Sequence, residues 1–264
     1  MNEQLFYSQL EWVIGVGLFA LLFAAAELGF RVALRRKDQL GEAAKGQTST
    51  LQGAVLGLMG LLAGFCLSMA VSRFDLRKQI IIDEANAIGT CYLRTSLLPH
   101  PHSGKCERMV RTYLDERIKF SQLVTRGPQL QETLRSARGL QSRLWQEAVA
   151  ANDVSPTVAT GLFIQSLNDM IDIEATRMRS VENHVPIAVL VLLVLSAVAS
   201  AVLIGDVSGQ TGQRSRFATL TILALFALVI LIIIDLDRPR VGLVRLSFQS
   251  LVELRDGLPP APSR

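Results

Sequence analysis

Charged side chains are scarce in this chain of 264 residues. Lysine, arginine, aspartate and glutamate together make up 19% of it, whereas soluble domains contain about 25%. Half of the residues are hydrophobic. This composition excludes an ordinary soluble domain and indicates a chain that is in contact with lipid.

Cysteine is also rare, and its spacing excludes a disulfide framework. The three cysteines are Cys66, Cys91 and Cys106, an odd number at irregular intervals. Cys66 lies in an apolar run, where a thiol serves as a small buried side chain. Cys91 and Cys106 are expected to form a disulfide only if they face an oxidising compartment.

The motifs of catalysis and cofactor binding are missing too. The sequence has no Gly-x-Ser-x-Gly turn, no phosphate-binding loop and no paired histidine ligands. His100 and His102 stand near Cys106 in a segment broken by prolines, and their spacing fits no usual zinc site. We therefore expect no enzyme, no metal and no cofactor.

The distribution of charge excludes nucleic acid as a partner. The net charge is +4, but residues 73–184 carry 15 Lys or Arg against 13 Asp or Glu. The basic excess lies beside membrane ends, where it meets lipid headgroups. Residues 1–11 contain no Lys or Arg, so they are not a secretory signal with a basic start, and the first helix is expected to be retained.

Four apolar stretches dominate what is present. Each is long enough to cross the hydrocarbon layer of about 30 Å as a helix, because a helix rises about 1.5 Å per residue and hydrocarbon requires an internally hydrogen-bonded backbone. The stretches run over Trp12 to Leu34, Leu51 to Ser72, Val185 to Gly205 and Phe217 to Ile234. The sequence predicts an all-α membrane protein with four transmembrane helices.

The segments between these stretches predict two helical hairpins with a helical insert between them. Residues 37–50 and 205–214 are expected to be loops, the second a tight turn because it holds three glycines. Helical periodicity and proline breaks predict insert helices over about 76–98, 103–124, 129–151 and 155–183. The predicted divisions are a first hairpin (1–72), the insert continuous with the second transmembrane helix (73–184), a second hairpin (185–238) and a C-terminal tail (239–264), whose proline-rich end is expected to be disordered.

The second transmembrane helix has a small and polar face. At about 100° per residue the face begins with Gly53 and is continued past the membrane to Gly89. Two interpretations remain open: close helix packing through small-xxx-small motifs, or the lining of a water-filled pore in which Phe65 forms an apolar constriction and Asp75 an acidic ring. The candidate pore-lining residues are Gly57, Gly60, Gly64, Phe65, Ser68, Ser72, Asp75, Gln79 and Asn86.

Acidic residues near the predicted membrane ends form a second group of candidates. Glu27 is four residues from Arg31, so the two can pair on one helical face. Asp235 and Asp237 end the fourth stretch beside Arg238, either as interfacial anchors or at the mouth of an ion path. Glu84 lies opposite Asn86, so one of them is expected to face the axis and the other the insert. Local pairing on a solvated surface is the alternative for Glu84.

Several motifs resemble the Bestrophin-like domain family of bacterial membrane proteins. They are Gln52 to Leu58 with Gly64-Phe65, Ser72 to Arg77, Asp83 to Thr90, Tyr92 to Arg94, and Asp235 to Arg240 with Gly242. The resemblance covers both hairpins and the start of the insert. It implies an architecture similar to that of bestrophins, which are pentameric ion channels lined by their second membrane helix and keep the insert in the cytoplasm.

The sequence supports two functional hypotheses. The first is a homo-oligomeric ion channel in the cell (inner) membrane, a pentamer by resemblance, in which the lipid bilayer and permeant ions are the partners. The second is a non-conducting membrane interaction or scaffold protein that acts through the insert. Orientation stays open: the first helix has no Lys or Arg before it and five after it, which favours an outside N-terminus and opposes the cytoplasmic insert of bestrophins.

Overall fold

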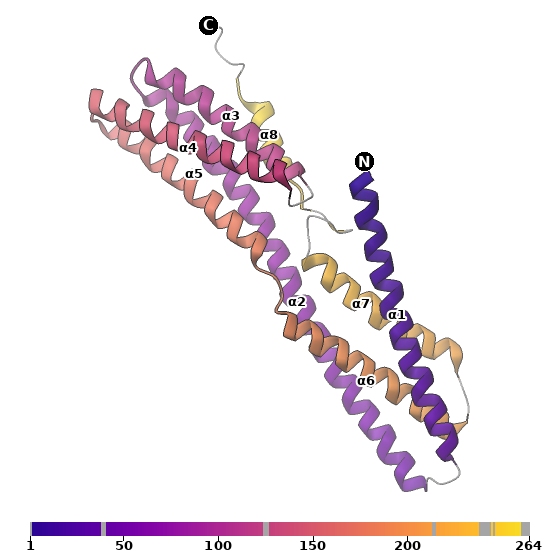
Figure 1. Cartoon of the computed structure of the whole chain (residues 1–264). Helices are drawn as coiled ribbons and strands as arrows, with labels where there is room; N and C mark the ends of the chain where they lie inside the picture. Colours follow the sequence, from indigo (N-terminus) through magenta and orange to yellow (C-terminus); the bar gives the residue numbers. More distant parts are fainter. Residues whose placement is uncertain are drawn as a thin grey trace. The chain divides into compact units, whose positions relative to one another are not determined.

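The predicted transmembrane helices are all present. The computed structural model describes residues 2–37, 41–123, 127–212, 215–237, 244 and 246–259, and every regular element within these ranges is a helix (Figure 1). Four of these helices are long and apolar enough to cross a membrane: α1 (Asn2–Arg36), α2 (Glu42–Arg94), α6 (Ile187–Thr211) and α7 (Arg216–Asp237). The predicted all-α membrane fold is confirmed.

The chain forms two compact units. The membrane unit comprises Met1–Phe74 and His184–Arg245, and the insert unit comprises Asp75–Asn183 and Leu246–Arg264. The 53-residue helix α2 belongs to both units, since Phe74 and Asp75 are consecutive residues within it. The sequence therefore continues the second transmembrane helix directly into the insert without a break.

Small side chains let the helices of the membrane unit pack closely. Its core takes alanines from all four helices together with larger aliphatic residues, so that small and large side chains fill the space between neighbouring helices. The buried members are Leu22 and Ala26 of α1, Met59, Ala63, Cys66 and Ala70 of α2, Leu193, Ala197 and Ala201 of α6, and Leu223, Ala227, Ile230, Ile233 and Leu236 of α7.

The closest helix contact is between α1 and α6, and it depends on glycine. A Cβ atom added to Gly205 would lie 1.9 Å from the carbonyl oxygen of Ala26, and one added to Gly29 would lie 2.1 Å from that of Val202. No side chain fits at such distances, so the two backbones touch directly. This is the geometry for which small-xxx-small sequences are selected in membranes.

The loop expected at residues 205–214 is therefore largely wrong. Helix α6 continues to Thr211, and Gly205 and Gly209 are helical residues in contact with α1. Only Gly212 has the left-handed backbone expected of a turn glycine, with φ of 69°. The loop expected at 37–50 is shorter as well, because α2 begins at Glu42.

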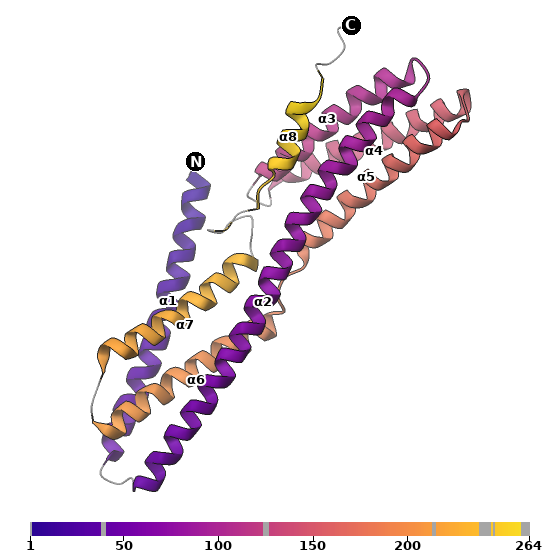
Figure 2. The ribbon, with the colours of Figure 1, turned by 180° about the vertical axis from the view of Figure 1, so that it is seen from behind.

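The insert unit is a bundle of helices around the C-terminal part of α2. The short 3-10 helix η2 (Thr95–Leu97) ends α2, and α3 (His102–Gln122), α4 (Pro128–Val154) and α5 (Val158–Glu182) follow. These helices run alongside α2 in both views (Figures 1 and 2). The core between them is apolar and includes Ile88, Val110, Leu114, Leu144, Leu167 and Met170. Helix α5 begins after Thr157, which forms a capping box with Thr160, rather than at Ser155.

A further helix lies in the segment assigned to a tail. Helix α8 (Gln249–Gly257) is packed on α3, and its Leu251 is fully buried in the core of the insert unit. Its sequence, QSLVELRDG, is short, and a helix of this length is marginal by itself, so packing against the bundle stabilises it. The predicted disordered end of the tail lies outside the described residues from Pro260 onward.

We predict that Gly205→Ala separates α1 from α6 and destabilises the membrane unit. The added methyl group would overlap the Ala26 carbonyl oxygen, and overpacking of this kind costs about 1–3 kcal/mol. Thermal unfolding of the full chain in lipid nanodiscs measures the effect. Gly17→Ala is the matched control on α1, because nothing lies within 4 Å of the added Cβ there. Equal unfolding temperatures for the two variants would refute the direct backbone contact.

Candidate functional site

One side of α2 is left uncovered by the rest of the chain. All nine candidate pore-lining residues are exposed. In the membrane unit they are Gly57, Gly60, Gly64, Phe65, Ser68 and Ser72, and in the insert unit they are Asp75, Gln79 and Asn86. We call these nine residues the exposed face of α2. The opposite side of the same helix holds the buried residues of the membrane core, such as Met59 and Cys66.

The glycines of the exposed face do not pack against other helices of the same chain. A Cβ atom added to Gly57, Gly60 or Gly64 meets nothing within 4 Å, and the same holds for Gly53, one turn before this face. Within the membrane unit, close packing through glycine is found instead between α1 and α6, at Gly29 and Gly205. The small side chains on α2 therefore leave an open surface rather than a helix contact inside one chain.

Helix α8 covers the far end of this side of α2. Gly89, which the sequence placed on the small and polar face, is half-buried, and a Cβ added to it would lie 3.1 Å from Cδ1 of Leu254 in α8. Asn86, one turn earlier, is exposed. The open surface in the insert unit thus ends beside α8.

Glu84 is the centre of a buried cluster of charges in the insert unit. Its side chain is fully buried, so the solvated surface position considered for it is wrong. Oε1 accepts a hydrogen bond from Nε of Arg117 at 2.5 Å, and Oε2 accepts one from Nη1 of Arg177. A second carboxylate, Glu174, lies 3.4 Å from Nη1 of Arg117. The cluster connects α2 with α3 and α5 and balances two positive with two negative charges.

One aromatic side chain, Phe120, lies beside both arginines. The guanidinium carbon of Arg117 lies 4.6 Å from the centre of the Phe120 ring, and that of Arg177 lies 5.2 Å from it, within the range of a cation–π contact. Burial opposes the charge on both guanidiniums. Burial is the largest single effect on Arg117, but Glu84, Tyr113 and Glu174 together outweigh it, so the pKa of Arg117 is raised. Burial prevails at Arg177, whose pKa is lowered. Both stay charged at neutral pH.

The sequence-based prediction missed Arg117, Glu174 and Arg177, although a signal for them was present. Glu174 and Arg177 continue a helical series of buried residues on α5 that starts with Phe163, Leu167 and Met170. Charged residues in register with an apolar stripe point into the core, and buried charges require partners. Arg117 likewise follows Val110 and Leu114 on the buried side of α3.

Two arginines of the family-like motif Ser72 to Arg77 bind backbone carbonyl groups at the end of α5 and just after it. In the insert unit, Arg77 is buried and donates from Nε to Ser180 at 3.1 Å and from Nη2 to Asn183 at 2.8 Å. In the membrane unit, Arg73 donates from Nη1 to the carbonyl oxygen of His184 at 2.6 Å. The bond to Ser180 satisfies a carbonyl group that the last turn of α5 leaves open, and the bonds to Asn183 and His184 hold the segment just after the helix.

The carboxylates of Asp235 and Asp237 at the end of α7 also accept hydrogen bonds from backbone amides. Asp237 accepts a hydrogen bond from the amide of Val185 at 2.9 Å and lies 3.2 Å from Nδ1 of His184. Asp235 accepts one from the amide of Val244 at 3.0 Å. Both carboxylates are buried, so they fix connecting segments of the membrane unit. Arg238, the cation expected beside them, lies outside the described residues.

Glu27 has the local partner that its spacing suggested. Nε of Arg31 lies 2.8 Å from Oε1 of Glu27, one turn along α1. The Arg31 side chain is largely exposed and that of Glu27 is half-buried. The pair is an exposed interaction along one helix, separate from the exposed face of α2.

We predict that Glu84→Gln destabilises the insert unit by about 3 kcal/mol. Removing one partner of a buried ion pair leaves the remaining charge uncompensated, which is the costly case, and here two arginines lose their shared carboxylate. Hydrogen exchange of the amides of α3 and α5 in the full chain measures the local free energy of opening. Asp83→Asn is the matched control, since Asp83 is only half-buried and accepts its hydrogen bond from Gln79 on the same helix. Unchanged protection in Glu84→Gln would contradict the role of the cluster.

We predict that Arg77→Lys loosens the C-terminal end of α5. A lysine has no planar fork with which to reach the carbonyl groups of Ser180 and Asn183 together, and hydrogen bonds from a charged group contribute about 1.5–3 kcal/mol each. Hydrogen exchange at the last turn of α5 is expected to accelerate by about tenfold or more, because each 1.4 kcal/mol corresponds to a factor of about ten. Lys78→Gln, a change at the exposed neighbouring position, is expected to leave exchange there unaltered. Equal hydrogen-exchange rates in both variants would show that the hydrogen bonds from Arg77 do not hold the end of α5.

Comparison with known proteins agrees with the resemblance seen in the motifs. The Bestrophin-like domain family matches residues 17–251. Among solved structures, a bacterial bestrophin homologue from Klebsiella pneumoniae is similar with a TM-score of 0.62 and 14% identity over 92% of this chain and 99% of that chain. A single-residue variant of that homologue gives a TM-score of 0.66 and 14% identity over 92% and 96%.

At this level of identity the structural likeness shows the fold. No curated protein matches the sequence. The family match, by contrast, extends from the middle of α1 to the start of α8 and includes the whole insert. The chain therefore belongs to the Bestrophin-like domain family.

Proposed function

We propose that this protein is a homo-oligomeric ion channel of bestrophin-like architecture, with its pore lined by the exposed face of α2. The observation that carries the proposal is that all nine residues of this face are exposed, while the opposite side of α2 is buried. Within the membrane unit, the hydroxyl groups of Ser68 and Ser72 are poorly solvated by hydrocarbon, and Asp75, Gln79 and Asn86 continue the face into the insert unit. Such a face needs either another protein surface or water beside it.

A pore along this face requires several copies of the chain. One helix from each chain can surround an axis only if the copies are arranged in a closed ring, which head-to-tail contacts between identical chains form when their rotation closes. The number five is taken from the resemblance to bestrophins. The glycines would then serve two purposes, because they let neighbouring copies of α2 approach each other and keep the axis wide.

The order of residues along α2 assigns roles within the pore. Phe65 is 63% exposed although it is large and apolar, so a ring of these side chains would form an apolar constriction that gates by excluding water. Asp75 is exposed three residues beyond Ser72, and a ring of carboxylates there would favour cations. The channel would lie in the cell (inner) membrane, with lipid around the outer surfaces of α1, α6 and α7.

Planar bilayer recording of the purified full chain tests the proposal. Unitary currents that depend on the salt gradient are expected. If no current appears under varied voltage and ions, and the protein measured in native lipid nanodiscs is a monomer or dimer, the channel proposal fails. The protein would then be a non-conducting interaction protein that acts through the insert.

We predict that two substitutions on the exposed face of α2 change different properties of the current, one its size and the other its ion selectivity. Phe65→Ala removes the apolar constriction and should raise unitary conductance or open probability several-fold. Asp75→Ala removes the acidic ring and should lower the cation-to-anion permeability ratio, which is read from the reversal potential in a salt gradient. Phe217→Ala on α7 is the control, because Phe217 is 84% exposed but does not belong to α2. Currents that respond equally to all three substitutions would argue against α2 as the lining.

A further inference from the structure

A groove lies between α3 and α4 on the surface of the insert unit. It has a volume of about 440 Å³, within the range of about 300–1,000 Å³ that is usual for small-molecule sites. Its lining residues are Lys105, Arg108, Met109 and Thr112 of α3, and Leu140, Arg143, Gln146 and Glu147 of α4. The groove belongs to the insert alone, so binding in it does not depend on conduction.

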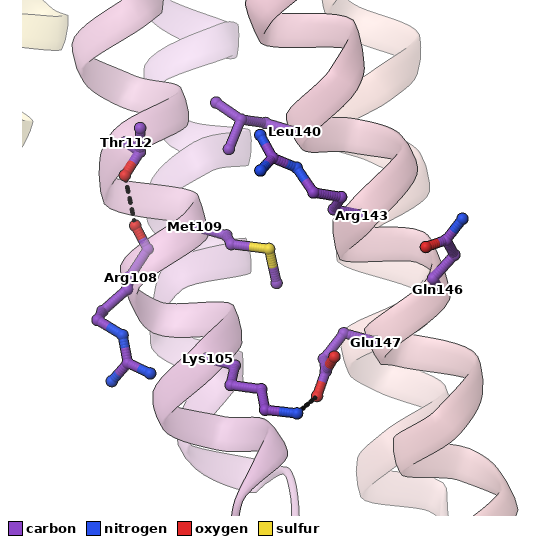
Figure 3. A pocket seen from close by; sticks show the side chains of 8 residues that line it. All are labelled: Lys105, Arg108, Met109, Thr112, Leu140, Arg143, Gln146 and Glu147. Atoms are coloured by element: carbon purple, nitrogen blue, oxygen red, sulfur yellow. Dashed lines mark hydrogen bonds and ion pairs between the residues drawn. The ribbon is translucent and has the colours of Figure 1, made fainter.

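The groove combines an apolar floor with a cationic side chain directly over it. Figure 3 shows Arg143 reaching from α4 toward α3 beside Leu140, while Met109 projects from α3 into the same gap. Both arginines of the groove, Arg108 and Arg143, are exposed. Neither forms an ion pair among the residues that the structure describes; Nε of Arg143 has only a 3.3 Å bond to the carbonyl oxygen of Gly139.

The single carboxylate of the groove is already occupied. Oε1 of Glu147 lies 2.9 Å from Nζ of Lys105 and 2.7 Å from Nδ1 of His102, and the Lys105 contact closes one end of the groove (Figure 3). The hydrogen bond from Lys105 lowers the pKa of Glu147, so this carboxylate stays ionised and paired. The lining has three cationic side chains and one anionic side chain, and of the two arginines only Arg143 reaches into the gap, whereas Arg108 points away from it (Figure 3).

We propose that this groove binds an amphipathic phosphate, that is, a phosphomonoester with an apolar body. The guanidinium of Arg143 would hold the phosphate through paired N–H donors, a geometry that arginine provides and lysine does not. The apolar body would cover Met109 and Leu140. A soluble phosphate ester and the headgroup of phosphatidic acid share this chemistry.

Phenyl phosphate is the probe for the test, titrated calorimetrically into the full chain in phosphatidylcholine nanodiscs. Phenyl phosphate is expected to bind several-fold more tightly than inorganic phosphate, because only the ester covers the apolar floor. Arg143→Gln should weaken its binding by about fivefold, the upper end for an exposed charge pair, and Arg143→Lys should restore the affinity only in part.

Arg138→Gln is the matched control. Arg138 is an exposed arginine of the same helix that does not line the groove, so its loss changes the net charge equally without changing the site. Since Arg138 and Arg143 are both exposed, neither substitution should disturb folding, which circular dichroism checks. Absence of phenyl phosphate binding to the wild type, or equal weakening by Arg138→Gln and Arg143→Gln, would overturn the proposal.

A second arm identifies the source of the phosphate. Nanodiscs with phosphatidic acid mixed into the phosphatidylcholine are compared with phosphatidylcholine alone. If phosphatidic acid reduces the affinity of the wild type for phenyl phosphate but not that of Arg143→Gln, the natural ligand is the lipid headgroup. If phosphatidic acid has no effect while Arg143-dependent binding persists, the ligand is a soluble ester. Either result supports a phosphate site in the groove.

Discussion

The structure depends on the contrast between a buried side and an exposed side of α2. One side of the helix is packed by the chain itself, against the apolar core of the membrane unit and then against the core of the insert unit. The other side carries glycine, serine, aspartate and amide side chains and has no cover from the same chain along the exposed face. In the membrane unit, the serine hydroxyls of this side are poorly solvated by hydrocarbon, which is why the proposed function places water or another copy of the chain beside them.

The other helices fix α2 in place by different means in the two units. In the membrane unit, alanine-rich packing and the glycine contact between α1 and α6 create a compact support for its buried side. In the insert unit, the contact is ionic as well as apolar, since Glu84 is shared by Arg117 and Arg177. Within each unit, these contacts bury one side of α2 and leave the other side free.

The sequence predicted the features that repeat along one helix. Long apolar runs identified the four spans, and proline breaks identified the insert helices. A 100° periodicity placed on one face of α2 the nine residues that the structure leaves exposed. The charge cluster was not predicted because its partners are far apart in the sequence. Arg117 is 33 residues from Glu84, and Arg177 is 93 residues from it. Helix α8 was not predicted because a sequence this short gives little helical signal by itself and is stabilised by packing against α3. Gly205 and Gly209 were assigned to a turn because glycine serves both turns and close helix contacts.

Cysteine accessibility at Ser68 in lipid measures the central claim most directly. The native cysteines that could compete, Cys66, Cys91 and Cys106, are buried. If the exposed face of α2 borders a water-filled axis, a membrane-impermeant thiosulfonate reagent modifies Ser68→Cys rapidly, and modification changes the current. Leu195→Cys on α6, which is also exposed in the single chain, should react far more slowly because lipid surrounds it. Equal, slow modification at both positions would contradict a water-filled path along α2.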